Sequence, residues 1–217
     1  MVLIAIPNMG KISTPLVKRL MKYDKREDVQ IEFNSKVPVD VNRNDIVNWF
    51  LDETDHEYLC MIDADIVPQE DLLDVLEYDK EIISPIVFSM KEGIPYPVIS
   101  TFKDKENLKH YKMEIGSDEE VMSVDGVGTG CIFIKRNVFE ELEKPYFHFR
   151  KNDNGTLNTG EDMYFTQKAK RAGFDIHIAM DYVASHFHEV DLKHVSKLLN
   201  LAIKTNMEDI YFKEKRE

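Results

Sequence analysis

Short apolar runs alternate with segments of helical spacing through the first 90 residues, and this alternation constrains the fold more than any other feature. Each apolar run ends at a turn-forming residue, and each helical segment carries its apolar side chains on one face. The predicted order is strand Val2–Ile6, helix Thr14–Tyr23, strand Val29–Phe33, helix Asn42–Leu51, strand Tyr58–Ile62, a helix opened by Pro68, and strand Glu81–Phe88. This order is typical of parallel strands joined by crossover helices.

The pattern becomes irregular after about residue 90. Short strands joined by polar turns are predicted at Pro95–Phe102, Tyr111–Met113, Glu120–Val124 and Cys131–Ile134, with a glycine-rich break at Gly126–Gly130. A short helix over Arg136–Leu142, a polar, aromatic-rich loop over Lys144–Asn158, a helix over Gly160–Arg171 and a strand over Phe174–Ile178 follow. Beyond about Val190 the spacing of Val195, Leu198, Leu199, Ala202 and Ile203 predicts an amphipathic helix. No linker divides the chain, so we expect a single α/β domain with a mixed central sheet.

The charge of the chain limits its partners. Lys and Arg total 28 against 40 Asp and Glu, which gives a net charge of −12 over 217 residues. A broad nucleic-acid-binding surface is therefore not expected, although a phosphorylated small molecule can bind if a cation mediates. Cys60 and Cys131 lie inside apolar runs without metal-ligand spacing, which favours a reducing compartment.

Targeting features point to the same compartment. No apolar run approaches the roughly 20 residues that span a bilayer, and the first ten residues do not resemble a signal peptide. We expect a cytoplasmic protein, in the host cytoplasm if the chain is viral, and peripheral contact with a membrane stays open.

Two aspartates, Asp63 and Asp65, leave the apolar run YLCMI directly at its carboxyl end. Side chains at i and i+2 of an extended backbone point the same way, so both carboxylates can approach one cation. Ligands of open α/β sheets bind at this edge, and hard oxygen ligands favour Mg²⁺ or Mn²⁺. The alternative is that the two acids only form a turn or cap the helix after Pro68.

Further acids and histidines follow later in the chain. Glu161 and Asp162 stand in the first turn of a predicted helix, where the helix dipole alone can account for them. His186 and His188 alternate after a predicted strand and so share one face of an extended segment. They are either a surface pair or include a metal ligand.

Together these stretches resemble a glycosyltransferase of the GT-A fold, close to the family 2 type of bacteria, archaea and their viruses. The resemblance covers most of the chain, through VLIAIPNMGKI, Asn42-Arg43-Asn44, MIDADIVP, DGVGTGCIFIKRNVFEEL, GEDMYFTQKAKRAGFDI and His186. It implies a single Rossmann-like α/β/α domain, with a nucleotide-binding half at 1–90, an acceptor and catalytic half at 91–189 and a C-terminal amphipathic helix at 190–217.

The resemblance also assigns roles to residues. Asp162 is the expected catalytic base with Glu161 beside it, and Mn²⁺ or Mg²⁺ is expected at Asp63, Asp65 and His186. The expected donor-binding residues are Pro7, Asn8, Arg43, Asp63, Gly128 and Gly130. Asn34-Ser35-Lys36 stands where many members carry an aspartate for the nucleotide base, so UDP- and GDP-sugars both stay open as donors.

The expected activity is therefore metal-dependent transfer of a sugar from a nucleotide diphosphate to a hydroxyl of a glycan, protein or lipid, with inversion. Two alternatives remain at this point. A non-catalytic nucleotide-sugar or glycan-binding protein could keep the same fold. A sugar nucleotidyltransferase shares the sheet type and the metal, although Pro7–Lys11 is short for the basic, glycine-rich loop such an enzyme needs.

Overall fold

The computed structural model describes residues 1–91, 94–104, 109–112, 119–187, 193, 195–197 and 199–200. The elements are, in order, β1 (Val2–Asn8), α1 (Thr14–Tyr23), β2 (Val29–Ser35), α2 (Val39–Glu53), β3 (Tyr58–Ile62), β4 (Ile66–Val67), the 3₁₀ helix η1 (Leu72–Tyr78), β5 (Ile82–Lys91), β6 (Ile94–Pro97), β7 (Ile99–Asp104), β8 (Lys109–Lys112), β9 (Val121–Val124), β10 (Gly126–Val127), β11 (Cys131–Lys135), α3 (Arg136–Glu141), β12 (Arg150–Lys151), β13 (Leu157–Thr159), α4 (Glu161–Arg171) and β14 (Ile176–His186).

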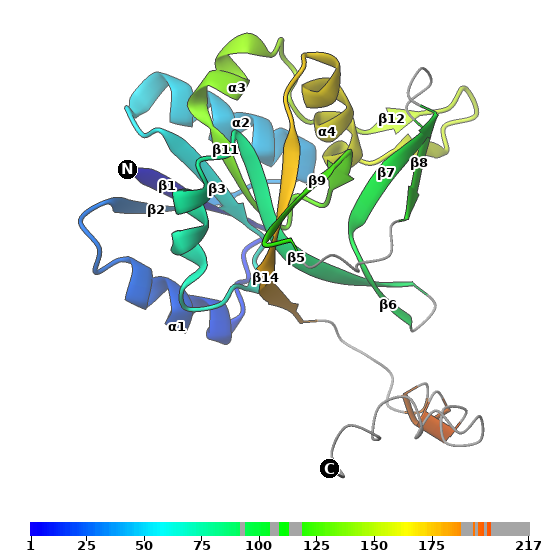
Figure 1. Ribbon diagram of the computed structural model, residues 1–217, viewed down its shortest axis with the longest axis horizontal. Coiled ribbons are helices and arrows are strands. Elements are labelled where there is room, and N and C mark those ends of the chain that lie inside the picture. The colour runs from blue at the N-terminus through cyan, green and yellow to red at the C-terminus, as the bar shows by residue number, and fades with distance from the viewer. Residues whose placement is uncertain are drawn as a thin grey trace.

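A mixed sheet forms the centre of the molecule (Figure 1). Its main strand order among the described residues is β2-β1-β3-β11-β5-β14-β4, with β6 paired to β5 and β9 paired to β14. Strand β1 runs parallel to β2 and β3, as the alternating first half predicts, and β11 enters antiparallel between β3 and β5. The predicted mixed α/β class is confirmed.

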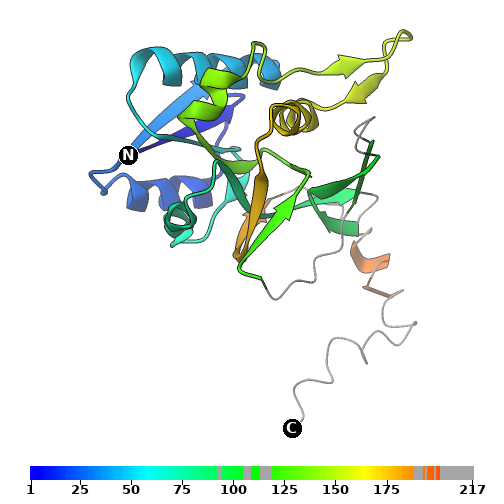
Figure 2. The same ribbon diagram turned by 45° about the horizontal axis from the view of Figure 1, so that its top comes forward.

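Helices cover both faces of the sheet (Figures 1 and 2). Strand β1 is buried along its whole length, and its side chains alternate between the two faces. Leu3 and Ala5 belong to a core cluster with residues of α2, α3 and α4, whereas Ile4 and Ile6 belong to a second cluster with residues of α1 and η1. The result is the predicted α/β/α layering.

The second half adds two smaller sheets on the side of α4. Strands β10, β7 and β8 form an antiparallel sheet, and β12 and β13 form a two-stranded hairpin that extends away from the main sheet (Figure 2). The chain therefore reaches α4 from a hairpin and leaves it directly into β14. This arrangement brings the first turn of α4 toward the carboxyl ends of β1 and β3.

Several elements differ from the sequence prediction: the predicted strand Pro95–Phe102 is two strands, β6 and β7, and the predicted loop Lys144–Asn158 contains β12 and the start of β13. The segment after Pro68 forms a 3₁₀ helix instead of an α-helix, because Leu72, Val75 and Tyr78 recur every third residue and face the core together. The last predicted strand is much longer than expected, since β14 continues past Ile178 to His186 and pairs in turn with β9, β5 and β4.

Part of the prediction falls on residues that are not described. His188 and most of the predicted helix at 190–217 lie outside the described residues. No helix among the described residues combines the length and the apolar character that crossing a bilayer requires.

Candidate active site

A cleft of about 760 Å³ opens at the carboxyl ends of β1 and β3. Its walls include four of the predicted site residues, namely Pro7, Asn8, Asp63 and Asp65. Lys11 and Lys36 also line it, and they place positive charge in a cleft of a strongly acidic chain. The cleft lies at the carboxyl edge of the sheet, which is where open α/β sheets bind their ligands.

The two aspartates reach this cleft through a turn. Strand β3 ends at Ile62, and the amide of Ile66 donates to the carbonyl of Asp63 at 2.9 Å. The backbone amide of Asp63 donates to the carbonyl of Gly130 at 2.8 Å, which fixes the start of the turn. The extended i, i+2 geometry expected from the sequence is therefore absent from this turn, although both acids line the same cleft.

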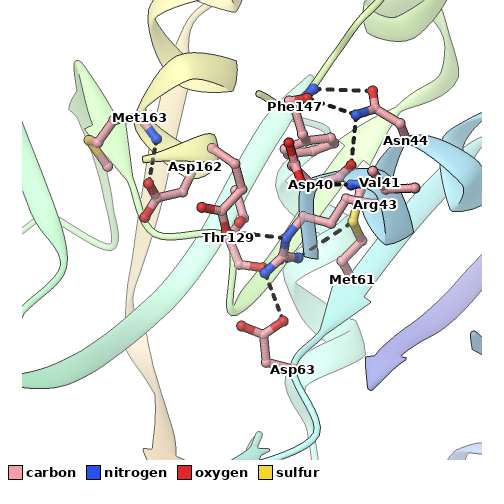
Figure 3. Close-up of polar contacts among 11 residues, drawn as sticks. Asp40, Val41, Arg43, Asn44, Met61, Asp63, Thr129, Phe147, Asp162 and Met163 are labelled. Atoms are coloured by element: carbon pink, nitrogen blue, oxygen red, sulfur yellow. Dashed lines mark hydrogen bonds and ion pairs between the residues drawn. The ribbon is translucent and has the colours of Figure 1, made fainter. Parts of the chain in front are cut away.

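Arg43 holds the carboxylate of Asp63 from inside the protein (Figure 3). Its side chain is only 2% exposed, and its Nη2 donates to Asp63 Oδ1 at 2.8 Å. Its Nη1 donates to the carbonyl of Thr129 at 3.2 Å, and its Nε lies 3.7 Å from Oε1 of Glu161. Arg43 thus links the aspartate turn after β3 to α4, and its predicted role in donor binding stays a prediction.

The environment of Asp63 affects its ionisation. Burial raises the pKa of Asp63 above its usual value, and the nearby charge of Asp65 acts in the same direction. The guanidinium of Arg43 opposes both effects. Arg43 is therefore the group that keeps a partly buried carboxylate charged at the floor of the cleft.

Asp65 meets a residue from the far end of the described chain. The antiparallel pairing of β14 with β4 places His186 opposite Ile66, and His186 Nε2 lies 3.4 Å from Asp65 Oδ2. His186 Nδ1 is 2.7 Å from the carbonyl of Phe88. If Nδ1 carries the proton, it donates to this carbonyl and leaves Nε2 as the basic nitrogen beside the carboxylate.

This donor set fits a divalent ion with two protein ligands. Metal-bound histidines characteristically donate their second ring N–H to a carbonyl or carboxylate, and His186 has such a carbonyl partner. Carboxylate oxygen suits Mg²⁺ and Mn²⁺. Among the described residues, no group of three or more His, Cys, Asp or Glu side chains is arranged to hold a metal. The remaining ligands would therefore have to come from a substrate and water.

The first turn of α4 lies across Arg43 from the aspartates. Burial raises the pKa of Glu161, and the neighbouring Asp162 raises it further. Burial also raises the pKa of Asp162, while the amide of Met163, which donates to its Oδ1 at 2.6 Å, lowers it (Figure 3). Arg43 thus connects the two predicted acidic groups of the site, which lie about 100 residues apart in the sequence.

The two predicted donor-site glycines have different surroundings. A Cβ at Gly128 would lie 2.8 Å from Cγ1 of Val98, so packing against β-structure explains this glycine. A Cβ at Gly130 would lie 3.4 Å from Oδ2 of Asp63, which is ordinary contact distance. Gly130 therefore borders the site directly, whereas Gly128 is required by the fold.

Asn8 is occupied with the protein's own backbone. Its Nδ2 donates to the carbonyls of Ile6 and Asn34, each at 3.1 Å, and its Oδ1 accepts from the amide of Gly10 at 2.9 Å. Asn42, which was not predicted as a site residue, donates to the carbonyls of Asn34 and Lys36 at 3.0 and 3.1 Å. The two asparagines fix the loops at this end of the cleft.

Asn44 was also missed by the sequence prediction. Its Oδ1 accepts from the amide of Tyr146 at 2.8 Å, and its Nδ2 donates to the carbonyls of Phe147 and Asp40, both at 2.7 Å (Figure 3). Phe147 stacks on Phe165 of α4 with ring centroids 4.9 Å apart. The signal in the sequence was the run Asn42-Arg43-Asn44, which interrupts the apolar spacing of the helix with three polar residues.

Comparisons with known proteins give a fold but no family. No family model matches the chain, and no curated protein sequence does. Among solved structures, the crystal structure of A197 from STIV is 25% identical, with a TM-score of 0.63 over 87% of this chain and 86% of that chain. GalNAc-T7, crystallised with UDP, GalNAc and Mn²⁺, is 11% identical with a TM-score of 0.54, over 88% of this chain and 43% of that one.

The chain has a GT-A-like fold. A further similar structure is residues 1–349 of TarS from S. aureus in complex with UDP-GlcNAc, at 12% identity and a TM-score of 0.47, over 88% of this chain and 59% of that one. This chain therefore spans less than half of the GalNAc-T7 structure and most of A197. The predicted fold is confirmed at the level of the GT-A-like architecture, and the family 2 assignment stays a prediction.

Proposed function

We propose that this protein is a metal-dependent glycosyltransferase, which moves a sugar from a UDP- or GDP-linked donor to an acceptor hydroxyl with inversion. One observation carries the proposal. Buried Arg43 joins Asp63, at the floor of a cleft that also holds Asp65, to Glu161 in the helical turn that carries Asp162. Arg43 thereby links the aspartate turn after β3 to the first turn of α4, and this link supports a site in which two bound substrates are held in a fixed relation.

The cleft is suited to a nucleoside diphosphate. Lys11 can approach phosphate oxygens, as can Lys36 if it leaves its ion pair with Asp45, and Asp65 with His186 would hold Mn²⁺ or Mg²⁺. A bound divalent ion supplies the positive charge that stabilises the departing diphosphate. Asp63, oriented by Arg43, is placed to accept hydrogen bonds from the sugar or ribose hydroxyls of the donor.

Asp162 is the proposed base for the acceptor hydroxyl. Burial raises the pKa of Asp162, and a carboxylate of raised pKa is a stronger proton acceptor. Its backbone partner, the amide of Met163, holds one carboxylate oxygen. The other oxygen is then the one to take the proton as the hydroxyl attacks the anomeric carbon and the bond to the diphosphate breaks.

Donor binding tests the metal arrangement. Calorimetry should detect UDP or GDP binding in Mn²⁺ or Mg²⁺ and much weaker binding in EDTA. Asp65→Ala and His186→Ala should each weaken the metal-dependent part, whereas Asp74→Ala, which removes the same charge from an exposed position in η1, should not. Equal affinity in EDTA would contradict the proposed role of the metal.

Transfer tests the base. A panel of nucleotide sugars identifies the donor through metal-dependent hydrolysis or transfer, and Asp162→Asn should then slow transfer by about 10²–10⁴-fold with donor affinity nearly unchanged. Glu161→Gln should reduce the rate less, since Glu161 lies beside Arg43 and is not the proposed base. Retention of the anomeric configuration, read by NMR, would contradict Asp162 as the base. Donor binding without turnover across the panel would favour a non-catalytic sugar-nucleotide-binding protein instead.

A further inference from the structure

Three side chains that can carry positive charge surround one aromatic ring on α4. The guanidinium carbon of Arg150 lies 4.7 Å from the ring centroid of Tyr164, and Lys168 Nζ lies 5.8 Å from it. The imidazole of His148 meets the same ring edge to face, with centroids 5.6 Å apart. We call these four residues the Tyr164 cluster.

These cations are not paired with acids. Within the described part of the chain, no carboxylate lies within ion-pair distance of Arg150, Lys151 or Lys168, although acids outnumber bases overall. Elsewhere on α4, Lys170 does pair with Asp175 at 2.9 Å. On a chain of net charge −12, a concentration of unpaired cations at one aromatic ring indicates a surface shaped for an anion.

The cluster is held in position. Lys168 Nζ donates to the carbonyls of Glu143 and Pro145, which fixes its charge at the ring and leaves one N–H. The guanidinium of Arg150 lies over the ring of Tyr164, and its N–H donors project from the edge of the guanidinium plane. Such an edge matches the two oxygens of a carboxylate or phosphate.

The loop that carries the cluster is also anchored. Within the aromatic-rich loop Lys144–Asn158, Tyr146 and Phe147 are buried in the core. The loop returns to the surface at His148, and the β12–β13 hairpin that follows extends past α4 (Figure 2). The cluster thus forms on a rigid base and not on a closing lid.

Its place on α4 relates it to the reaction. Tyr164 lies three residues after Glu161, so the two side chains leave the same side of the helix about one turn apart. Asp162, the proposed base, is in the same turn as Glu161. A molecule bound at Tyr164 would therefore lie about one helical turn from the turn that carries the proposed base.

We propose that the Tyr164 cluster binds a phosphate or carboxylate group carried by the acceptor, so that the protein glycosylates an anionic sugar. The inference rests on the proposed glycosyltransferase function and narrows its acceptor. The aromatic face supplies apolar contact for the sugar ring, Arg150 supplies the paired donors, Lys168 supplies further positive charge, and His148 lies against the edge of the cluster. Asp162 then receives the proton from a hydroxyl of the same sugar.

Binding of simple sugars tests the idea without any need for transfer. Calorimetry with glucose 6-phosphate, glucuronate and glucose should give affinities at least about tenfold higher for one or both charged sugars, the low end of what a charge-assisted contact contributes. The Nε–H NMR signal of Arg150, assigned by its loss in Arg150→Gln, should shift with the charged sugar only. Preference for the phosphate or the carboxylate identifies the group.

Variants separate a specific site from general attraction. Arg150→Gln should remove most of the preference, and Arg150→Lys should retain part of it, since the charge stays but the paired donors are lost. Lys170→Gln removes the same charge from the same helix and should keep the full preference. Equal binding of glucose and the charged sugars, or no effect of Arg150→Gln, would overturn the proposal.

Two controls distinguish binding of an anionic sugar from effects on the nucleotide site and from binding to a membrane surface. UDP binding with Mn²⁺ should be unchanged in Arg150→Gln, and a wild-type protein that binds charged sugars but no nucleotide would refute the proposed transferase and not the anion site. Sedimentation with phosphatidylglycerol vesicles, without binding of the free sugars, would assign the cluster to a membrane surface and overturn an anionic sugar acceptor.

Discussion

Replacement of Arg43 by methionine tests the link between the two halves of the site. Methionine keeps an unbranched stem of similar reach in the core but removes the guanidinium that contacts Asp63 at 2.8 Å and lies 3.7 Å from Glu161. Loss of one partner from a buried ion pair leaves an uncompensated charge and costs about 3–5 kcal/mol. The side chain of Asp63 is 33% exposed and that of Glu161 14%, so water relieves part of this cost and we expect about 3 kcal/mol.

Urea unfolding at pH 7 measures this loss. For an m-value of about 2–3 kcal/mol per molar, the midpoint of Arg43→Met should fall by roughly 1–1.5 M relative to wild type. A change of m would mean that the variant has lost compactness and not only the ion pair. Arg43→Lys is the matched variant, because it keeps the charge but cannot reach Asp63 and the carbonyl of Thr129 together. Its urea midpoint should lie between those of wild type and Arg43→Met.

The effect of a second substitution on stability distinguishes a loss of charge pairing from a loss of packing. Asp63→Asn in the wild-type background removes the main partner of Arg43 and should destabilise the protein. The same change in the Arg43→Met background removes an unpaired charge and should restore stability, by about 1 kcal/mol or more. If Asp63→Asn destabilises both backgrounds equally, the buried ion pair is not the connection between β3 and α4, and the reasoning fails.

Three smaller predictions concern glycine packing and pH. Gly128→Ala should lower the unfolding free energy by about 1–3 kcal/mol, because its Cβ would approach Val98 Cγ1 to 2.8 Å; thermal unfolding checks this. Gly130→Ala should fold normally but weaken UDP binding in Mn²⁺, because its Cβ would sit 3.4 Å from Asp63 Oδ2; equal calorimetric affinity would contradict it. Burial lowers the pKa of His56 below its usual 6.5, so the unfolded chain binds the proton more readily and stability should fall as pH drops below 6.5. Urea unfolding at pH 7.5 and 5.5 should show a smaller fall in unfolding free energy for His56→Gln than for wild type.

The sequence predicted the sheet and helices of the first half well because each of those elements carries its own pattern. Strand β3 is a continuous apolar run that the fold buries completely, and α1 has a serine cap followed by proline in its first turn. Local signals of this kind need no partner to be read. The 3₁₀ form of η1 was not predicted, because apolar residues at 72, 73, 75 and 76 match an α-helical stripe almost as well as a three-residue repeat.

The site was less predictable because its contacts are long-range. Asp65 meets His186 only through the pairing of β14 with β4, and the sequence placed the end of that strand eight residues too early. The role of Arg43 was also hidden, since an arginine on an amphipathic helix is usually exposed. Its burial depends on acids supplied by β3 and α4 together, and no local pattern in α2 specifies them.

Helix α2 contacts the aspartate turn, the first turn of α4 and the aromatic loop from one element. Arg43 points toward Asp63 and Glu161, while its neighbour Asn44 holds the backbone at Tyr146 and Phe147 (Figure 3). Successive residues on a helix diverge by about 100°, so one turn of α2 contacts the aspartate turn and the base of the aromatic loop at once. Because the two contacts leave α2 from adjacent positions, the aspartate turn and the base of the aromatic loop share one rigid support.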